Sequence, residues 1–196
     1  SDVVLSVVSA DTGEATVSPA TLTFTSGNWS TAQTVTVTGV DDDLTDGNQT
    51  TAVTVSVVDG SSDNAFDALA DQTVTATTSD DDSPGVSVTE SDGSTGTTEG
   101  GGTDTFTVVL NTEPSSDVVL EVESADEDEV TVSPAQLTFT SSNWNSAQTV
   151  TVTGGDDTIV DSTQAVTVTV SVVDGSSADE YDPVADATVT VTNVDD

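Results

Sequence analysis

The stretch LTFTSSNW at positions 137–144, followed by QTVTVTG at 148–154, decides how the chain is organised because it occurs twice. The earlier copy reads LTFTSGNW at 22–29 and QTVTVTG at 33–39. In both copies, Thr and Val alternate after a turn that contains Asn and Trp. Such alternation is typical of a β-strand with one buried face. The repeated stretch therefore predicts a β protein built from two similar units.

The repeat has a fixed period of 115 residues. Residues 1–81 align with 116–196 without a gap, and 53 of the 81 aligned positions are identical. A period of this length is a common domain size. We expect a first repeat at 1–82 and a second, complete repeat at 83–196. Residues 82–115 have no counterpart ahead of Ser1, so the first repeat is expected to lack its N-terminal strands.

Alternating apolar residues run through both predicted units. The clearest case is Val166, Val168, Val170 and Val172, which are separated by Thr and Ser. Comparable segments predict strands at 1–8, 34–38, 53–57, 73–77, 86–90, 103–110 and 188–194. The Gly/Ser/Thr-rich segment between Glu90 and Glu99 is expected to be a turn region. With no helical periodicity, the fold class is predicted to be all-β, with antiparallel β-sandwiches whose Thr side chains face solvent.

The charge balance excludes several partners. The chain has 36 Asp and Glu and no Lys, Arg or His, so its formal net charge is -36. Nucleic acid is excluded because phosphate binding depends on Lys and Arg, and an anionic membrane surface would repel the chain. The apolar runs are too short for a membrane span. Self-repulsion of this size opposes compaction, so bound cations or high salt are expected to screen it.

Composition also argues against catalysis. The chain lacks the His, Lys, Cys and Arg that commonly act as base, nucleophile or electrostatic clamp, so we expect no enzyme. Trp29 and Trp144 follow Asn in a turn and could stack on a sugar, as in a carbohydrate-binding module. Packing over the end of the core is the favoured alternative, because a sandwich with few aromatic residues uses them inside.

Acidic residues gather where the predicted strands of the second repeat end, and one more precedes the strand at 103–110. They are Glu99, Asp156, Asp157, Asp161, Asp195 and Asp196. Clustered carboxylates without nearby His or Cys suit calcium, which takes six to eight oxygen ligands. In a chain without cationic side chains, such clusters are costly unless ions neutralise them. Solvated acidic loops of a salt-adapted protein are the alternative interpretation.

These residues, together with the strand at 103–110, resemble the Calx-beta domain, an immunoglobulin-like sandwich found in sodium/calcium exchangers and large bacterial surface proteins. The LTFT, NW and QTVTVTG segments resemble repeats of giant secreted adhesins. The resemblance implies that the six acidic residues named above bind Ca2+ at one end of the sandwich. In the first repeat it implies the ligands Asp41, Asp42, Asp46, Asp80, Asp81 and Asp82. Thr158 stands where the family often has a third Asp.

The function expected from these observations is a calcium-binding extracellular repeat that acts as a rigid spacer in a long surface adhesin or matrix protein. Its partners would be neighbouring repeats or identical subunits. One alternative is a subunit of an extracellular filament assembled by strand donation between chains. A second alternative is a calcium-sensing or carbohydrate-binding module, with a glycan as a possible ligand.

Overall fold

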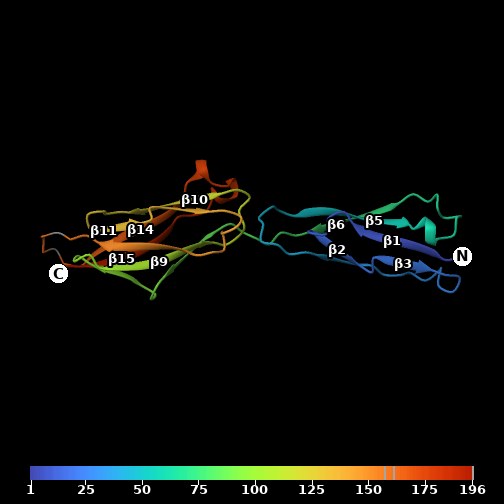
Figure 1. Cartoon of the computed structure of the whole chain (residues 1–196), viewed down its shortest axis with the longest axis horizontal. Helices are drawn as coiled ribbons and strands as arrows, with labels where there is room; N and C mark the ends of the chain where they lie inside the picture. The colour runs from blue at the N-terminus through green and yellow to red at the C-terminus, as the bar shows by residue number, and fades with distance from the viewer. Residues whose placement is uncertain (157, 161, 196) are drawn as a thin grey trace. The chain divides into compact units, whose positions relative to one another are not determined.

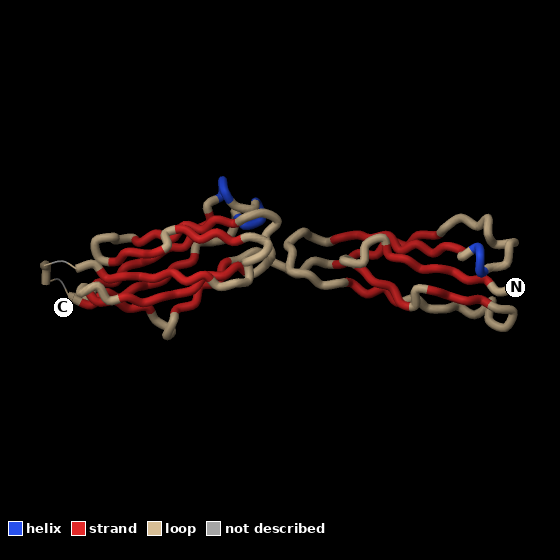
Figure 2. Tube along the Cα trace, viewed as in Figure 1, coloured by secondary structure: helices blue, strands red, loops and turns tan. Residues whose placement is uncertain are grey.

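The computed structural model describes residues 1–156, 158–160 and 162–195, and most of them lie in strands and the loops between them (Figure 1, Figure 2). The chain divides into two compact units. The first comprises residues 1–42 and 46–81, and the second comprises residues 43–45 and 82–196. In the described part, the helical segments are short 3-10 turns: η1 (Asp59–Ser61), η2 (Asp174–Ser176) and η3 (Asp179–Tyr181). This confirms the all-β fold class.

The first unit contains two sheets. Its strands are β1 (Val3–Ser9), β2 (Ala15–Ser18), β3 (Thr21–Phe24), β4 (Thr36–Gly39), β5 (Gln49–Val57) and β6 (Gln72–Thr78). One sheet has four strands in the order β3-β1-β5-β6, and β2 pairs with β4 in a sheet of two strands. All pairings in this unit are antiparallel.

The second unit has the same strands and three more. The additional strands are β7 (Val86–Glu90), β8 (Thr95–Thr98) and β9 (Thr103–Leu110). The shared strands are β10 (Val118–Ser124), β11 (Val130–Ser133), β12 (Gln136–Phe139), β13 (Gln148–Gly154), β14 (Gln164–Val172) and β15 (Ala187–Val194). They form a sheet in the order β12-β10-β14-β15-β8 and a sheet in the order β11-β13-β9-β7.

The register of the second unit explains its alternating sequence. In β14, Val166, Val168 and Val170 are buried, and Thr167 between them is exposed. Cross-strand partners repeat this alternation, as in the pair Val122 and Val170. Successive side chains of a strand point to opposite faces of its sheet, so the Val rows form the core and most Thr residues meet solvent, as predicted.

The segment between Glu90 and Glu99, expected to be a turn region, contains strand β8. This strand pairs with β15 in parallel, with Thr95 opposite Val191 and Thr98 opposite Val194. The expectation was wrong because the buried positions of β8 are Thr95 and Thr97, whose hydroxyls hide the usual apolar alternation. The named strands of the second unit therefore pair antiparallel, apart from β8 with β15.

The second unit has a continuous core between its two sheets. Nineteen buried residues form it, and the largest side chains among those less than 2% exposed are Tyr181, Phe106, Phe139 and Leu120. In the first unit the corresponding cluster of buried residues is Val7, Leu22 and Val53, with partly buried neighbours around it. The two units thus share a strand plan and differ greatly in how much of their core is covered.

Candidate functional site

One end of the second unit carries a buried carboxylate. Glu99 follows β8 directly and is 3% exposed. Its backbone N–H donates to the carbonyl of Val194 at 3.0 Å, which places Glu99 beside the end of β15. Burying a carboxylate is costly unless other groups compensate its charge. Because the chain has no Lys, Arg or His, no side chain can supply a positive charge here.

The same end collects the residues that follow β13 and β15. The N–H of Gly154 donates to the carbonyl of Gly102 at 2.9 Å, so the loop that begins after β13 starts beside the loop that follows Glu99. Asp156 lies in the former loop and is exposed, whereas Asp195 follows β15 and is half-buried. The structure therefore brings Glu99, Asp156 and Asp195 to one end of the unit.

The calcium ligand set itself stays a prediction. Asp157, Asp161 and Asp196 lie outside the described residues. Among the residues that the structure describes, no three Asp or Glu lie close enough together to hold a metal ion. Calcium is a hard divalent cation that binds through oxygen atoms, so the carboxylates and backbone carbonyls at this end are chemically suitable ligands.

The first unit repeats part of this arrangement. Asp41, Asp42 and Asp46 lie exposed in the loop after β4. The carboxylate of Asp80, which follows β6, accepts a hydrogen bond from the N–H of Gly47 at 2.7 Å. The equivalent bond in the second unit runs from the N–H of Ser162 to the carboxylate of Asp195 at 3.0 Å. In each unit, an aspartate that follows the last strand thus accepts a hydrogen bond from the backbone of the acidic loop.

One pair of equivalent positions in these loops has the same backbone conformation. Gly47 has φ of 74° and Ser162 has φ of 70°, so both lie in the left-handed region. Glycine adopts this region without steric cost, whereas a residue with a Cβ atom does not. The second unit therefore holds its loop with a strained serine.

Asp81 and Asp82 complete the predicted ligands of the first repeat. Asp81 is exposed and Asp82 is half-buried, and both lie in the loop after β6. Asp80 and Asp81 belong to the first unit and Asp82 to the second.

Sequence reasoning missed one acidic position at this end, namely Glu14 and its equivalent Glu129. Partial burial and the neighbouring carboxylates of Asp46, Asp42 and Asp11 raise the pKa of Glu14. In the second unit, the carboxylate of Glu129 accepts a hydrogen bond from the side-chain amide of Asn193 at 3.2 Å. The signal was present in the repeat, because glutamate occupies both positions, immediately before β2 and β11.

The two Trp residues have different environments. Trp144 is 9% exposed and belongs to the core of the second unit, as the packing interpretation predicted. Trp29, at the equivalent position of the first unit, is 72% exposed. The local turn is the same, since the side-chain carbonyl of Asn28 or Asn143 accepts from the N–H three residues before it. The difference therefore comes from what covers each indole ring.

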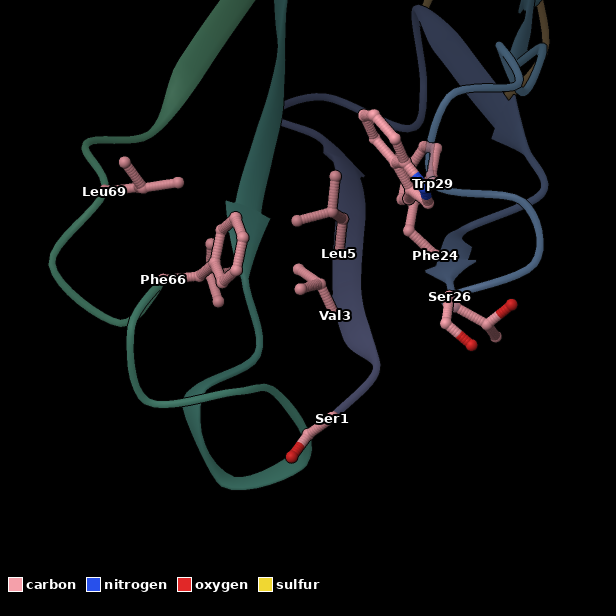
Figure 3. A pocket seen from close by; sticks show the side chains of 10 residues that line it. Ser1, Val3, Leu5, Phe24, Ser26, Trp29, Phe66 and Leu69 are labelled. Carbon is pink, nitrogen blue, oxygen red and sulfur yellow. The ribbon is translucent and has the colours of Figure 1, made fainter.

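Trp29 borders an apolar pocket of about 450 Å³ in the first unit. Figure 3 shows Leu5, Phe24 and Phe66 around this pocket. The complete lining is Ser1, Val3, Leu5, Phe24, Thr25, Ser26, Trp29, Val57, Phe66 and Leu69. A pocket of this size is large enough for an apolar side chain or a small ligand.

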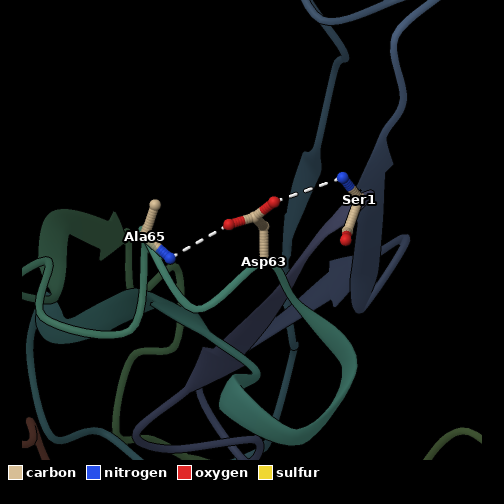
Figure 4. A network of polar contacts seen from close by, with 3 residues as sticks. All are labelled: Ser1, Asp63 and Ala65. Atoms are coloured by element: carbon tan, nitrogen blue, oxygen red, sulfur yellow. Dashed lines mark hydrogen bonds and ion pairs between the residues drawn. The ribbon is translucent and has the colours of Figure 1, made fainter.

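A short polar network lies beside this pocket (Figure 4). The carboxylate of Asp63 accepts hydrogen bonds from the N–H of Ala65 at 3.0 Å and from the terminal ammonium of Ser1 at 3.2 Å. These two donors, the Ala65 N–H first, lower the pKa of Asp63. The groups are exposed, so the network orders the loop after β5 without creating a buried charge.

Comparison with known proteins gives fold-level likeness only. No family model and no curated protein matches the chain. A crystal structure of domains 4 and 5 of the S-layer protein SbsC covers 97% of this chain and 70% of its own, at 16% identity and a TM-score of 0.41. A longer SbsC structure covers 97% of this chain and is itself covered to 20%, at 17% identity and a TM-score of 0.43.

A third structure, SSP-19 from Caenorhabditis elegans, described as an MSP-domain-like protein, matches 55% of this chain and 97% of its own at 16% identity and a TM-score of 0.36. At these values the likeness carries no argument about function. The resemblance to Calx-beta domains accordingly stays a prediction from the motifs. No helix among the described residues is long and apolar enough to cross a membrane.

Proposed function

We propose that the chain is a structural repeat of an extracellular surface protein, whose units serve as rigid spacers and bind calcium at their acidic ends. The observation that carries this proposal is that Glu99, Asp156 and Asp195 lie at the same end of the second unit. In a chain with a formal net charge of -36, a bound cation would offset the repulsion among such carboxylates. Calcium is the hard cation that carboxylate and carbonyl clusters favour.

Repetition of the acidic loop supports the same proposal. Asp80 and Asp195 make equivalent hydrogen bonds to the loops that carry the other predicted ligands of their units. Partial burial and repulsion by the neighbouring carboxylates raise the pKa of Glu14, and a bound cation would relieve the repulsion. An ion that joins these loops would hold the end of each sandwich in one conformation.

The proposed location follows from affinity. Extracellular calcium sites bind with a Kd of about 0.1 mM or weaker, and millimolar calcium outside cells would fill them. With calcium at about ten times this Kd, mass action would add about 1.4 kcal/mol of stability per site. This is a large fraction of the stability of an ordinary domain, about 5 to 15 kcal/mol. Calcium would therefore act as a structural component of the spacer.

A thermal melt tests the proposal. The chain is melted in EDTA and then with calcium, magnesium or sodium at matched ionic strength. We expect a rise in Tm that is specific to calcium and is largely lost in Glu99→Gln. The control Asp117→Asn removes an exposed charge ahead of β10, at the opposite end of the unit, and should keep the calcium response. An equal rise in Tm with every salt would contradict specific calcium binding and would indicate general charge screening in a salt-adapted protein.

A further inference from the structure

The first unit exposes residues whose equivalents form the core of the second unit. Trp29 is 72% exposed, against 9% for Trp144. Val74 is 60% exposed, against 2% for its equivalent Val189. Val37, on β4, is 41% exposed, although its equivalent on β13 is completely buried. The same apolar face is therefore covered in the second unit and open in the first.

The cover in the second unit is β9, the strand at 103–110. It pairs antiparallel with β13, with Phe106 opposite Val150 and Val108 opposite Gln148. Its side chains Phe106, Val108 and Leu110 are at most 3% exposed. Ahead of the start of β13, the N–H of Leu110 donates to the carbonyl of Trp144 at 3.1 Å. Residues 1–81 contain no strand equivalent to β7, β8 or β9.

The pocket of Figure 3 is the place that the end of this cover would occupy. Its lining residues Phe24, Trp29 and Phe66 correspond to Phe139, Trp144 and Tyr181, which are all buried in the second unit. There, the hydroxyl of Tyr181 donates to the carbonyl of Thr112 at 2.7 Å. The chain just after β9 thus lies against the equivalents of the pocket residues.

Strand length gives a second sign of the missing cover. In the second unit, β13 runs over Gln148–Gly154. In the first unit, β4 runs over Thr36–Gly39 only, although the sequence QTVTVTG is identical. Backbone N–H and C=O groups of an uncovered edge are available for pairing with an added strand.

We propose that the open face of the first unit binds a segment with the residue pattern of positions 82–115, which adds a strand antiparallel to residues 33–38. The register of the second unit fixes the alignment: the residue equivalent to Phe106 lies opposite Val35, and the residue equivalent to Asp104 lies opposite Val37. The apolar row of the added strand covers Val35 and Val74, and the chain after it fills the pocket beside Trp29.

The donor is a further repeat of this type, outside residues 1–196. A second copy of these residues has no surplus segment, because its own 82–115 already completes its second unit. Exchange between two such copies would open one core for each core that it closes, so it offers no net apolar burial. The proposal does not depend on calcium, because the face is apolar and lies on strands shared by both units.

Two contacts of the second unit would be absent in the complex. Phe66 replaces Tyr181 and removes the hydroxyl that binds Thr112. Ala65 replaces Glu180, whose carboxylate accepts from the N–H of Ser115 at 2.7 Å. Binding by the first unit therefore relies on strand pairing and on the apolar row.

The test adds a synthetic peptide of sequence 82–115 to the full chain, in EDTA and in calcium. Both partners are acidic, so the buffer contains about 0.5 M salt, where the Debye length is roughly 4 Å. We expect the emission of Trp29 to shift to shorter wavelength as the indole becomes buried. Trp29→Phe removes this signal and leaves Trp144 as an internal reference. Hydrogen exchange of the amides in 33–38 should slow about tenfold at ten times the Kd.

Matched variants locate the binding. Val37→Asp places a charge on the open face and should weaken peptide affinity at least about tenfold, or 1.4 kcal/mol. Val8 lies exposed on β1, and its equivalent in the second unit is Glu123. Val8→Glu is therefore the control variant and should leave peptide affinity unchanged. A peptide carrying Phe106→Asp and Val108→Asp should not bind.

Two results would overturn the proposal. The first is no protection of residues 33–38 at any peptide concentration while the second unit stays protected. The second is concentration-dependent dimerisation of the chain alone that protects these residues, which would make a second copy the occupant.

Discussion

The two Trp residues allow one substitution to be compared in two environments. Trp144→Ala should destabilise the second unit by about 3 to 5 kcal/mol, the usual range for removing a buried Trp. Trp29 is 28% buried by the same measure that makes Trp144 91% buried. Scaling the cost by the buried fraction gives about 1 kcal/mol for Trp29→Ala.

Hydrogen exchange followed by mass spectrometry measures both effects in one protein. Amides of β10 and β14 report on the second unit, and amides of β1 and β5 report on the first. Each 1.4 kcal/mol corresponds to a tenfold change in the opening equilibrium, so Trp144→Ala should accelerate exchange in its unit by about two to three and a half orders of magnitude. Trp29→Ala should accelerate exchange in its unit by about fivefold.

Trp144→Phe is the control, because it keeps most of the apolar contact and should cost clearly less than Trp144→Ala. Equal acceleration by the two Ala variants would refute the reasoning, since it would mean that exposure of the first unit's face does not reduce what its Trp contributes. A larger effect for Trp29→Ala would refute it more strongly.

Two further predictions concern single side chains of the second unit. Ser162→Gly should stabilise this unit by about 1 kcal/mol, measured by urea unfolding, because glycine adopts the left-handed φ of 70° without strain, as Gly47 does in the first unit. Asp104 accepts hydrogen bonds from the Gly96 N–H, the Ser91 hydroxyl and its neighbour's N–H, which lower its pKa below 3.8. Its contribution is therefore complete above pH 3.8 and is lost as pH falls through the lowered pKa, so acid should reduce stability more in the wild type than in Asp104→Asn.

The strand plan could be predicted because it depends on a simple periodicity. Strands β7 and β9 have the predicted bounds, 86–90 and 103–110. Both alternate apolar and polar residues, and the pleat turns this pattern directly into a buried and an exposed face. Strand β8 was not predicted because its buried face is made of threonines, whose hydroxyls form hydrogen bonds within the unit. The hydroxyl of Thr97, for example, donates to the side-chain carbonyl of Asn193 at 2.9 Å.

The candidate site was only partly predictable for a different reason. Asp156 and Asp195 follow predicted strands, whereas Glu99 was expected to precede the strand at 103–110, and the structure places all three at one end of the second unit. Burial of Glu99 could not be foreseen, because it depends on the pairing of β8 with a strand almost 100 residues later. The open pocket beside Trp29 could not be predicted from the residues that line it either. Nearly the same residues are buried in the core of the second unit.

The parallel pairing of β8 with β15 has a mechanical consequence for the second unit. Because both strands run in the same direction, the chain leaves β15 at the end of the unit toward which β8 also points. Tension applied to the C-terminal end of β15, with β8 held at its N-terminal end, would slide the two strands along each other. The four paired positions from Thr95 to Thr98 would then share the load together. An antiparallel pair pulled at one end would instead open one hydrogen bond at a time.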